Sequence, residues 1–117
     1  PSNARYQGRV IMAKIFVNAT QARRDTRNNS AIHGEVRAIE SAVLANISAG
    51  VLYANVSAGT SMTDSNAYYK AYYGVTNDPT LVDQVNYVSQ YFANMGYGVK
   101  VRENAQTKNT LTWNISW

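Results

Sequence analysis

The 117-residue sequence predicts an α+β fold, in which a small three-stranded antiparallel sheet packs on two main helices and a short one. Two segments that end at a glycine carry apolar residues every three or four positions, which is typical of amphipathic helices. Two segments near the carboxyl end alternate apolar and polar residues, as strands of a hairpin do. We expect an extended N-terminal arm over residues 1–18 and one compact domain over residues 19–117, a length that suits a single core.

The arm changes in composition along its length. Residues 1–8 contain proline, serine, asparagine and glycine, whereas residues 10–17 are nearly all apolar apart from Lys14. The β-branched residues of this second part favour an extended conformation, although periodicity does not distinguish it from a helix fragment. It either packs on the core of its own domain or is covered by another chain. The candidate partner contacts in the arm are Arg5, Arg9, Ile11, Ile15 and Phe16.

A long helix is expected next, capped by Asn18 or Thr20 and ended by Gly50. Its second half carries an apolar stripe with spacings of four, three, four and four residues, formed by Ile32, Val36, Ile39, Val43 and Ile47.

The first half of this helix, residues 21–29, has almost no apolar face, and we call it the basic half-helix. If helical, it must project into solvent or bind a partner through polar contacts. Alternatively the helix begins at Asn29 or Ser30 and the preceding residues form a loop; we favour one long helix. The candidate partner contacts here are Arg23, Arg24 and Arg27.

The middle of the chain predicts a strand, a loop and a short helix. Residues 51–56 alternate as a half-buried strand does, and the serine-, threonine- and glycine-rich residues 57–65 form a loop. Ser65 or Asn66 then caps a helix over residues 67–73, which contains four tyrosines. We expect Tyr69 to share a face with Tyr72 or Tyr73, and Tyr68 to point partly away. Tyr68 and Tyr72 are candidate partner contacts, with packing between subunits favoured over stacking on a carbohydrate.

The second main helix opens at Asp78-Pro79, because aspartate caps first-turn amides and proline at the first position loses no needed donor. Its stripe runs from Leu81 to Met95, and Gly96 ends it. A hairpin of residues 97–103 and 110–117 follows, with its valines and both tryptophans on a common buried face. The predicted core is Ile32, Val36, Ile39, Val43, Leu81, Val85, Val88, Phe92, Val99, Val101, Trp113 and Ile115.

The net charge of +4 resides in the first 40 residues, which hold seven basic and three acidic side chains, while the remainder is neutral. Such a segment suits an acidic protein surface or nucleic acid, and we favour protein because no basic run exceeds two residues. The absence of cysteine excludes disulfides and thiolate chemistry, and it fits a reducing cytoplasm without requiring one. No window approaches the apolar length of a membrane span, so membrane insertion is not expected.

Catalytic motifs are absent from the sequence. His33 lies within the first predicted helix without an acidic partner at the spacing of a metal site or triad, and Glu35 and Glu40 lie elsewhere on the helical wheel. The glycines are scattered and form no phosphate loop. We therefore expect a protein that is not an enzyme, with no catalytic residues, metal ligands or cofactors. Turns and helix starts account for Asp64, Asp78 and Asp83.

Several short motifs occur together between residues 21 and 117. They are Ala22-Arg23 through Asn28-Asn29 before an Ile/Val-Glu helix, the Met62-Thr63 turn, Tyr68-Tyr69 followed by Gly74-Val75-Thr76, the helix exit from Tyr91-Phe92 to Gly96-Tyr97, and the ending Trp113-Asn114-Ile115-Ser116-Trp117. This stretch resembles a family of small virion structural proteins and repeated modules in tailed phages that infect cyanobacteria. The ending is the most specific element, and residues 1–18 fall outside the resemblance.

The resemblance implies a non-enzymatic structural protein of the virion, assembled in the host cytoplasm. Its expected partners are other virion proteins and copies of itself. It leaves open head decoration, a neck or tail component, and a fibre-associated or receptor- or carbohydrate-binding module. A nucleic-acid-binding accessory protein is the alternative from a different class.

Overall fold

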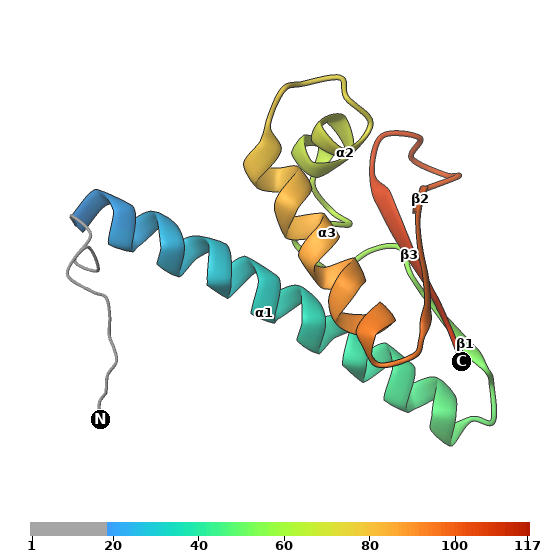
Figure 1. Ribbon diagram of the computed structural model, residues 1–117. Coiled ribbons are helices and arrows are strands. Elements are labelled where there is room, and N and C mark those ends of the chain that lie inside the picture. The colour runs from blue at the N-terminus through green and yellow to red at the C-terminus, as the bar shows by residue number, and fades with distance from the viewer. Residues whose placement is uncertain (1–18) are drawn as a thin grey trace, which may run out of the picture.

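The computed structural model describes residues 19–117, with side chains from residue 29 onward (Figure 1). Its first element is a single long helix, α1 (Ala19–Ser48), which confirms the favoured prediction of one helix. Gly50, at a φ of +78°, takes the left-handed position that ends α1. The amides of Gly50 and Val51 then bond back to the carbonyls of Ile47 and Asn46, at 3.0 and 2.9 Å.

Two further helices begin at the predicted caps. The Ser65 hydroxyl accepts a hydrogen bond from the amide of Ala67 at the start of α2 (Asn66–Tyr72). The Asp78 carboxylate accepts one from the amide of Leu81 at the start of α3 (Pro79–Asn94). Gly96, at a φ of +96°, ends α3 as predicted.

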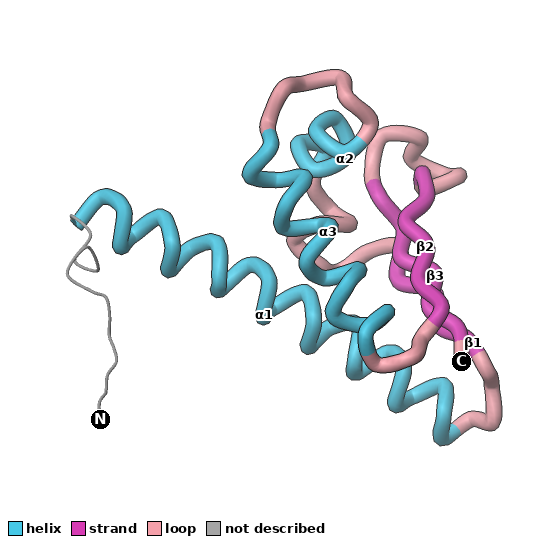
Figure 2. Tube along the Cα trace, viewed as in Figure 1, coloured by secondary structure: helices cyan, strands magenta, loops and turns pink. Residues whose placement is uncertain are grey.

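Three strands form one antiparallel sheet in the order β1-β3-β2, which confirms the predicted fold class (Figure 2). The strands are β1 (Tyr53–Val56), β2 (Gly98–Glu103) and β3 (Leu111–Ser116), so the last strand in the sequence is the central one. Val99 lies opposite Ile115 and Val101 opposite Trp113, as the predicted common face requires.

The core lies between one face of the sheet and the helices α1 and α3, and α2 packs on α3 (Figure 1). Seven of the predicted core residues are buried, namely Ile39, Val43, Val85, Val88, Phe92, Trp113 and Ile115. Ile32, Val36, Val99 and Val101 are partly buried and pack against them. The core also contains four apolar residues that the prediction omitted: Ala54, Val56, Met62 and Leu111.

Four apolar expectations were wrong or only partly right. Ile47, in the last turn of α1, and Met95, directly after α3, are about half exposed, at 48% and 51%. Leu81, in the first turn of α3, is half-buried and outside the core cluster. Trp117 follows the end of β3 and is only partly buried, so one tryptophan, not two, is fully enclosed.

The part of α1 before Ile32 projects away from the domain (Figure 1). A 30-residue α-helix is about 45 Å long, and Ile32 is the first apolar residue of α1, among the described side chains, that packs against the core. About the first 20 Å of the helix therefore extends beyond the packed domain. Within residues 19–117, no helix combines the length and the apolar character that crossing a membrane requires.

Candidate interaction surfaces and a buried carboxyl

Glu35 is the most deeply buried ionisable residue that the structure describes, with 1% of its surface exposed. Its Oε2 accepts hydrogen bonds from the Thr60 hydroxyl at 2.6 Å and from the Trp113 indole Nε1 at 2.8 Å. Its Oε1 accepts one from the amide of Met62 at 3.2 Å. The carboxyl therefore joins α1, the loop after β1 and the central strand β3.

The loop that meets Glu35 is held by threonine side chains. The hydroxyls of Thr60 and Thr63 bond to each other at 2.6 Å, and the amide of Thr63 donates to the Thr60 hydroxyl at 3.0 Å. All three hydrogen-bond donors to the Glu35 carboxyl belong to this chain. The carboxyl therefore serves to hold parts of the fold together. Its position could have been foreseen, since Glu35 lies three residues after Ile32 and four before Ile39, on the buried stripe.

Titratable residues do not gather into a metal site in the part of the chain that the structure describes. No group of three or more histidines, cysteines, aspartates or glutamates lies close enough there to hold a metal ion. His33 is exposed on α1, beside Arg37.

The tyrosines of α2 fasten this helix to the rest of the domain. Tyr68 is partly buried against the core, and its hydroxyl donates to Gln84 Oε1 at 2.5 Å, whereas the rings of Tyr69 and Tyr73 contact each other, as expected for residues that share a face. The Tyr69 hydroxyl donates to Glu103 Oε1 at 2.8 Å, and this bond raises the pKa of Tyr69. Tyr72 is also partly buried against the core. Partner contacts by Tyr68 and Tyr72 stay a prediction.

The stability of the domain should fall above pH 10.0 in part because of Tyr68. Burial, with a smaller effect of the carboxylates of Glu35 and Asp78, raises the pKa of Tyr68 above its usual 10.0. The unfolded chain then loses this proton first, so stability present below pH 10.0 is lost as the pH rises through the folded pKa. We expect the unfolding free energy of Tyr68→Phe to fall less steeply with rising pH than that of the unchanged chain. Urea unfolding at pH values on both sides of 10.0 measures this free energy. Tyr87→Phe, at an exposed tyrosine, is the control; equal slopes for both variants would contradict the expectation.

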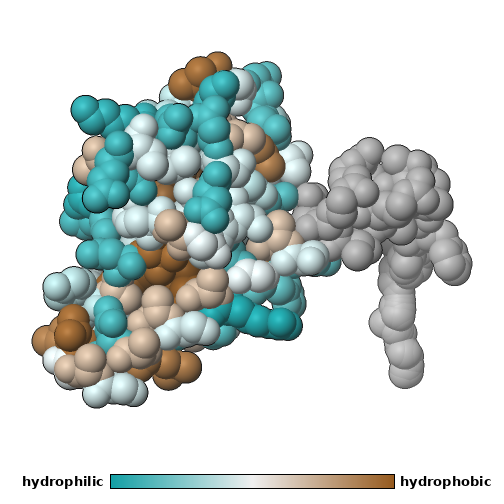
Figure 3. Space-filling view, turned by 180° about the vertical axis from the view of Figure 1, so that it is seen from behind, coloured by the Kyte–Doolittle hydropathy of each residue, from teal (hydrophilic) through white to brown (hydrophobic). Residues whose placement is uncertain are grey.

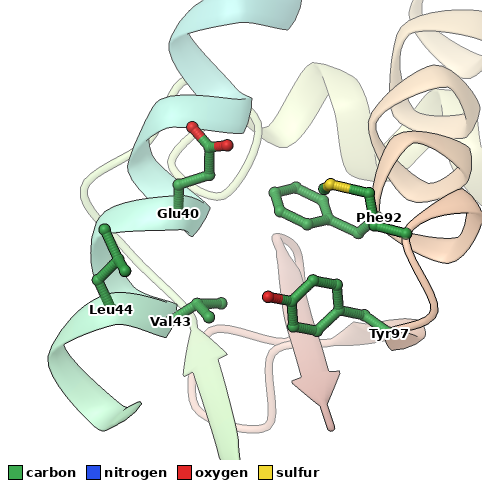
Figure 4. A pocket seen from close by; sticks show the side chains of 6 residues that line it. Glu40, Val43, Leu44, Phe92 and Tyr97 are labelled. Carbon is green, nitrogen blue, oxygen red and sulfur yellow. The ribbon is translucent and has the colours of Figure 1, made fainter. Parts of the chain in front are cut away.

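A groove between α1 and α3 is lined mainly by apolar side chains (Figure 4). It contains a pocket of about 280 Å³. Val43 and Leu44 come from α1 and Phe92 from α3, and the Tyr97 hydroxyl is directed toward α1. A second pocket, of about 210 Å³, adjoins it through Glu40 and continues toward Ile32. We call these two pockets together the α1–α3 groove; the first is lined by Glu40, Val43, Leu44, Phe92, Met95 and Tyr97.

Exposed apolar side chains surround the end of this groove. Leu44 is 63% exposed, and Ile47 and Met95 are about half exposed. Apolar surface gathers toward the lower end of the molecule, where α1 turns into β1 (Figure 3). Contiguous exposed apolar surface commonly marks an interaction site.

The outer face of the sheet has a different chemistry. A shallow hollow there is lined by Tyr53, Lys100, Arg102 and Asn114, among others. Asn114 donates to the side chain of Asn55 at 2.7 Å, which links β3 to β1 across this face. The outer face therefore carries polar side chains and two exposed cations.

The remaining predicted contacts cannot be placed on these surfaces. Arg5, Arg9, Ile11, Ile15 and Phe16 lie outside the described residues. The backbone of Arg23, Arg24 and Arg27 is in the projecting part of α1, before the first described side chain. Sequence reasoning missed the α1–α3 groove because it considered the apolar stripe of each helix separately.

Comparison of the chain with protein-family models, with curated proteins and with solved structures finds no match.

Proposed function

We propose that the chain is a non-enzymatic structural protein of a tailed-phage virion, which docks in many copies on other virion proteins through its arm and basic half-helix. The observation that carries this proposal is the projection of α1 beyond the core. The resemblance of residues 21–117 to small cyanophage virion proteins supplies the biological setting.

The projecting helix is unusual in physical terms. A helix gains most of its stability from packing an apolar face, and short isolated helices are marginal in water. The basic half-helix has almost no apolar residue, so its own domain offers it little packing. A partner that meets it with acidic side chains would supply the missing contacts through ion pairs and hydrogen bonds.

The arm is suited to joining subunits. A segment of extended backbone can add a strand to a neighbour, because main-chain hydrogen bonds give affinity while pockets take alternate side chains. Such contacts would suit head decoration and a neck or tail component alike. The copy number and neighbours of the protein in images of the particle would separate these places from a fibre-associated one.

Deletion of residues 1–17 should leave a folded, soluble domain that no longer joins the particle. The described core uses residues from Ile32 onward, so its packing is retained, whereas the arm contacts are lost. Circular dichroism reports the fold of the purified variant, and quantitative mass spectrometry of purified virions reports its incorporation.

The control for this deletion keeps the length of the arm but replaces residues 1–17 with glycine and serine. It should fail to incorporate as the deletion does, because the side chains are lost. Full incorporation of the truncated chain would overturn the proposed function.

The polar outer face of the sheet favours a second candidate, a nucleic-acid-binding accessory protein. Lys100 and Arg102 are exposed there beside Tyr53, and cations next to an aromatic ring suit a single-stranded backbone and its bases. Binding of this kind weakens steeply with salt. Affinity for single-stranded DNA that is absent, or that is insensitive to salt, would remove this candidate.

A further inference from the structure

We propose that the α1–α3 groove is the receptor for the apolar arm segment Val10–Val17 of a second copy of this chain. The inference deepens the proposed function and rests on it, since it names the surface that the arm joins. Seven of the eight residues in this segment are apolar, which makes it the natural complement of an uncovered apolar groove.

The groove is formed by residues that ordinarily avoid water. Phe92 and Val43 are buried at its base, whereas Leu44 and Met95 expose 63% and 51% of their surfaces at its rim. Burial of apolar surface contributes about 25 cal/mol per Å², so covering these two side chains is favourable. Their exposure in the single chain leaves this free energy available for association.

The arm of the same chain cannot reach this groove with its largest residues. Along α1, Leu44 is 25 residues from Ala19, which at the helical rise is about 37 Å. Phe16 is three residues from Ala19 and Ile15 is four, so a fully extended chain carries them at most about 10 to 15 Å. Phe16 and Ile15 can therefore occupy the groove only if the arm comes from a second copy.

The dimensions and charges of the two surfaces agree. The groove follows α1 from Ile32 to Leu44, about 18 Å, and an extended segment of eight residues spans about 23 Å. The segment contains a single charge, the cation Lys14, and the carboxylate of Glu40 lies where the two pockets of the groove adjoin. Arg37 and His33 line the second pocket, toward Ile32, so Glu40 is the acceptor that the groove offers to Lys14. An ion pair between these two side chains would fix the direction of the segment.

The absence of cysteine permits a direct test by disulfide formation between introduced cysteines. One full-length chain carries Phe16→Cys, and a second, distinguished by an affinity tag, carries Leu44→Cys. Docking raises the effective concentration of the two thiols, so we expect at least about tenfold more disulfide-linked heterodimer than in the control. The control replaces the second chain with Val75→Cys, whose position is 66% exposed and lies in the loop after α2, away from the groove. Equal yields in the two mixtures would overturn the inference.

A chain with both Phe16→Cys and Leu44→Cys tests the argument from reach. It should form disulfide-linked dimers and larger species, since its own two positions cannot meet. A monomer closed by an internal disulfide, seen by intact mass after limited proteolysis, would show that the groove receives its own arm and would contradict the exchange between copies.

Charge placed in the groove tests the surface without cross-linking. Leu44→Lys and Met95→Lys change exposed positions, so the fold should persist, but the concentration-dependent self-association seen by sedimentation should be lost. Val75→Lys should associate as the unchanged chain does. Unchanged association of the groove variants would refute the receptor role.

These measurements use purified chain without the particle, so their failure is distinct from failure of the proposed function. Incorporation of the arm-deleted chain into the particle would contradict the proposed function. Loss of incorporation together with equal cross-linking yields would keep the arm as a docking element but assign it another receptor.

Discussion

Trp113→Ala should destabilise the domain by about 3 to 5 kcal/mol, the usual cost of truncating a buried tryptophan. Trp113 is fully buried in the central strand β3, opposite both Val56 and Val101. Its removal would leave a cavity between the sheet and α1, and would also remove one donor to Glu35. Since small domains have a net stability of about 5 to 15 kcal/mol, the loss is a large part of the total. Urea unfolding followed by far-ultraviolet circular dichroism measures it.

Two control variants separate the causes of this loss. Trp113→Phe keeps much of the buried ring but lacks the indole N–H, so it should cost less than alanine while still losing the bond to Glu35. Trp117→Ala removes a partly buried ring beyond the last strand and should cost least. Equal losses for Trp113→Ala and Trp117→Ala would contradict the assignment of Trp113 as the central core residue.

The fold class was predictable because its signals are local. Asp78 and Pro79 mark the start of α3, and Gly50 and Gly96 mark helix ends through the left-handed backbone that glycine adopts readily. Alternation along β2 and β3 placed Val101 and Trp113 on one face, as the register confirms. Each of these inferences uses residues a few positions apart.

The parts that failed depend on contacts distant in the sequence. The central position of β3 places β1 beside the end of the chain, and no local pattern specifies that pairing. Met62, in a polar loop, is fully buried because the loop folds back over the core. Ile47 and Met95 continue the apolar stripes of their helices but are about half exposed, because which residues of a stripe are covered depends on the elements that pack against the helix.

The candidate sites were predictable only in part. The arm and the basic half-helix could be identified from composition. Their side chains are not among those that the structure describes, so their partner contacts stay predictions. The α1–α3 groove arises from two helices brought together in the fold, so periodicity within one helix could not reveal it. The bond of Tyr68 to Gln84 could not be predicted from a local pattern, because the two residues are 16 positions apart.

Glu35→Ala should cost at least about 3 kcal/mol, since each buried donor left without an acceptor costs about 1 to 3 kcal/mol. The change would leave three donors, on Thr60, Met62 and Trp113, without their acceptor. Because these donors belong to separate parts of the fold, the loop after β1 should also detach from α1. Urea unfolding measures the free energy, and hydrogen exchange at the amide of Met62 should report the detached loop.

Glu35→Gln and Glu40→Ala are the matched controls for this variant. Glutamine preserves the shape of the side chain and one acceptor oxygen, but its NH₂ group would face at least one of the donors. The loss of stability for Glu35→Gln should therefore lie between zero and that for Glu35→Ala. Glu40 lies on the same helix, is only partly buried, and accepts one long hydrogen bond, of 3.5 Å from Tyr91. Its replacement should change stability little, because the exposed Tyr91 hydroxyl that loses this acceptor can bond to water instead. Equal losses for Glu35→Ala and Glu40→Ala would show that the buried carboxyl does not hold the loop, α1 and β3 together.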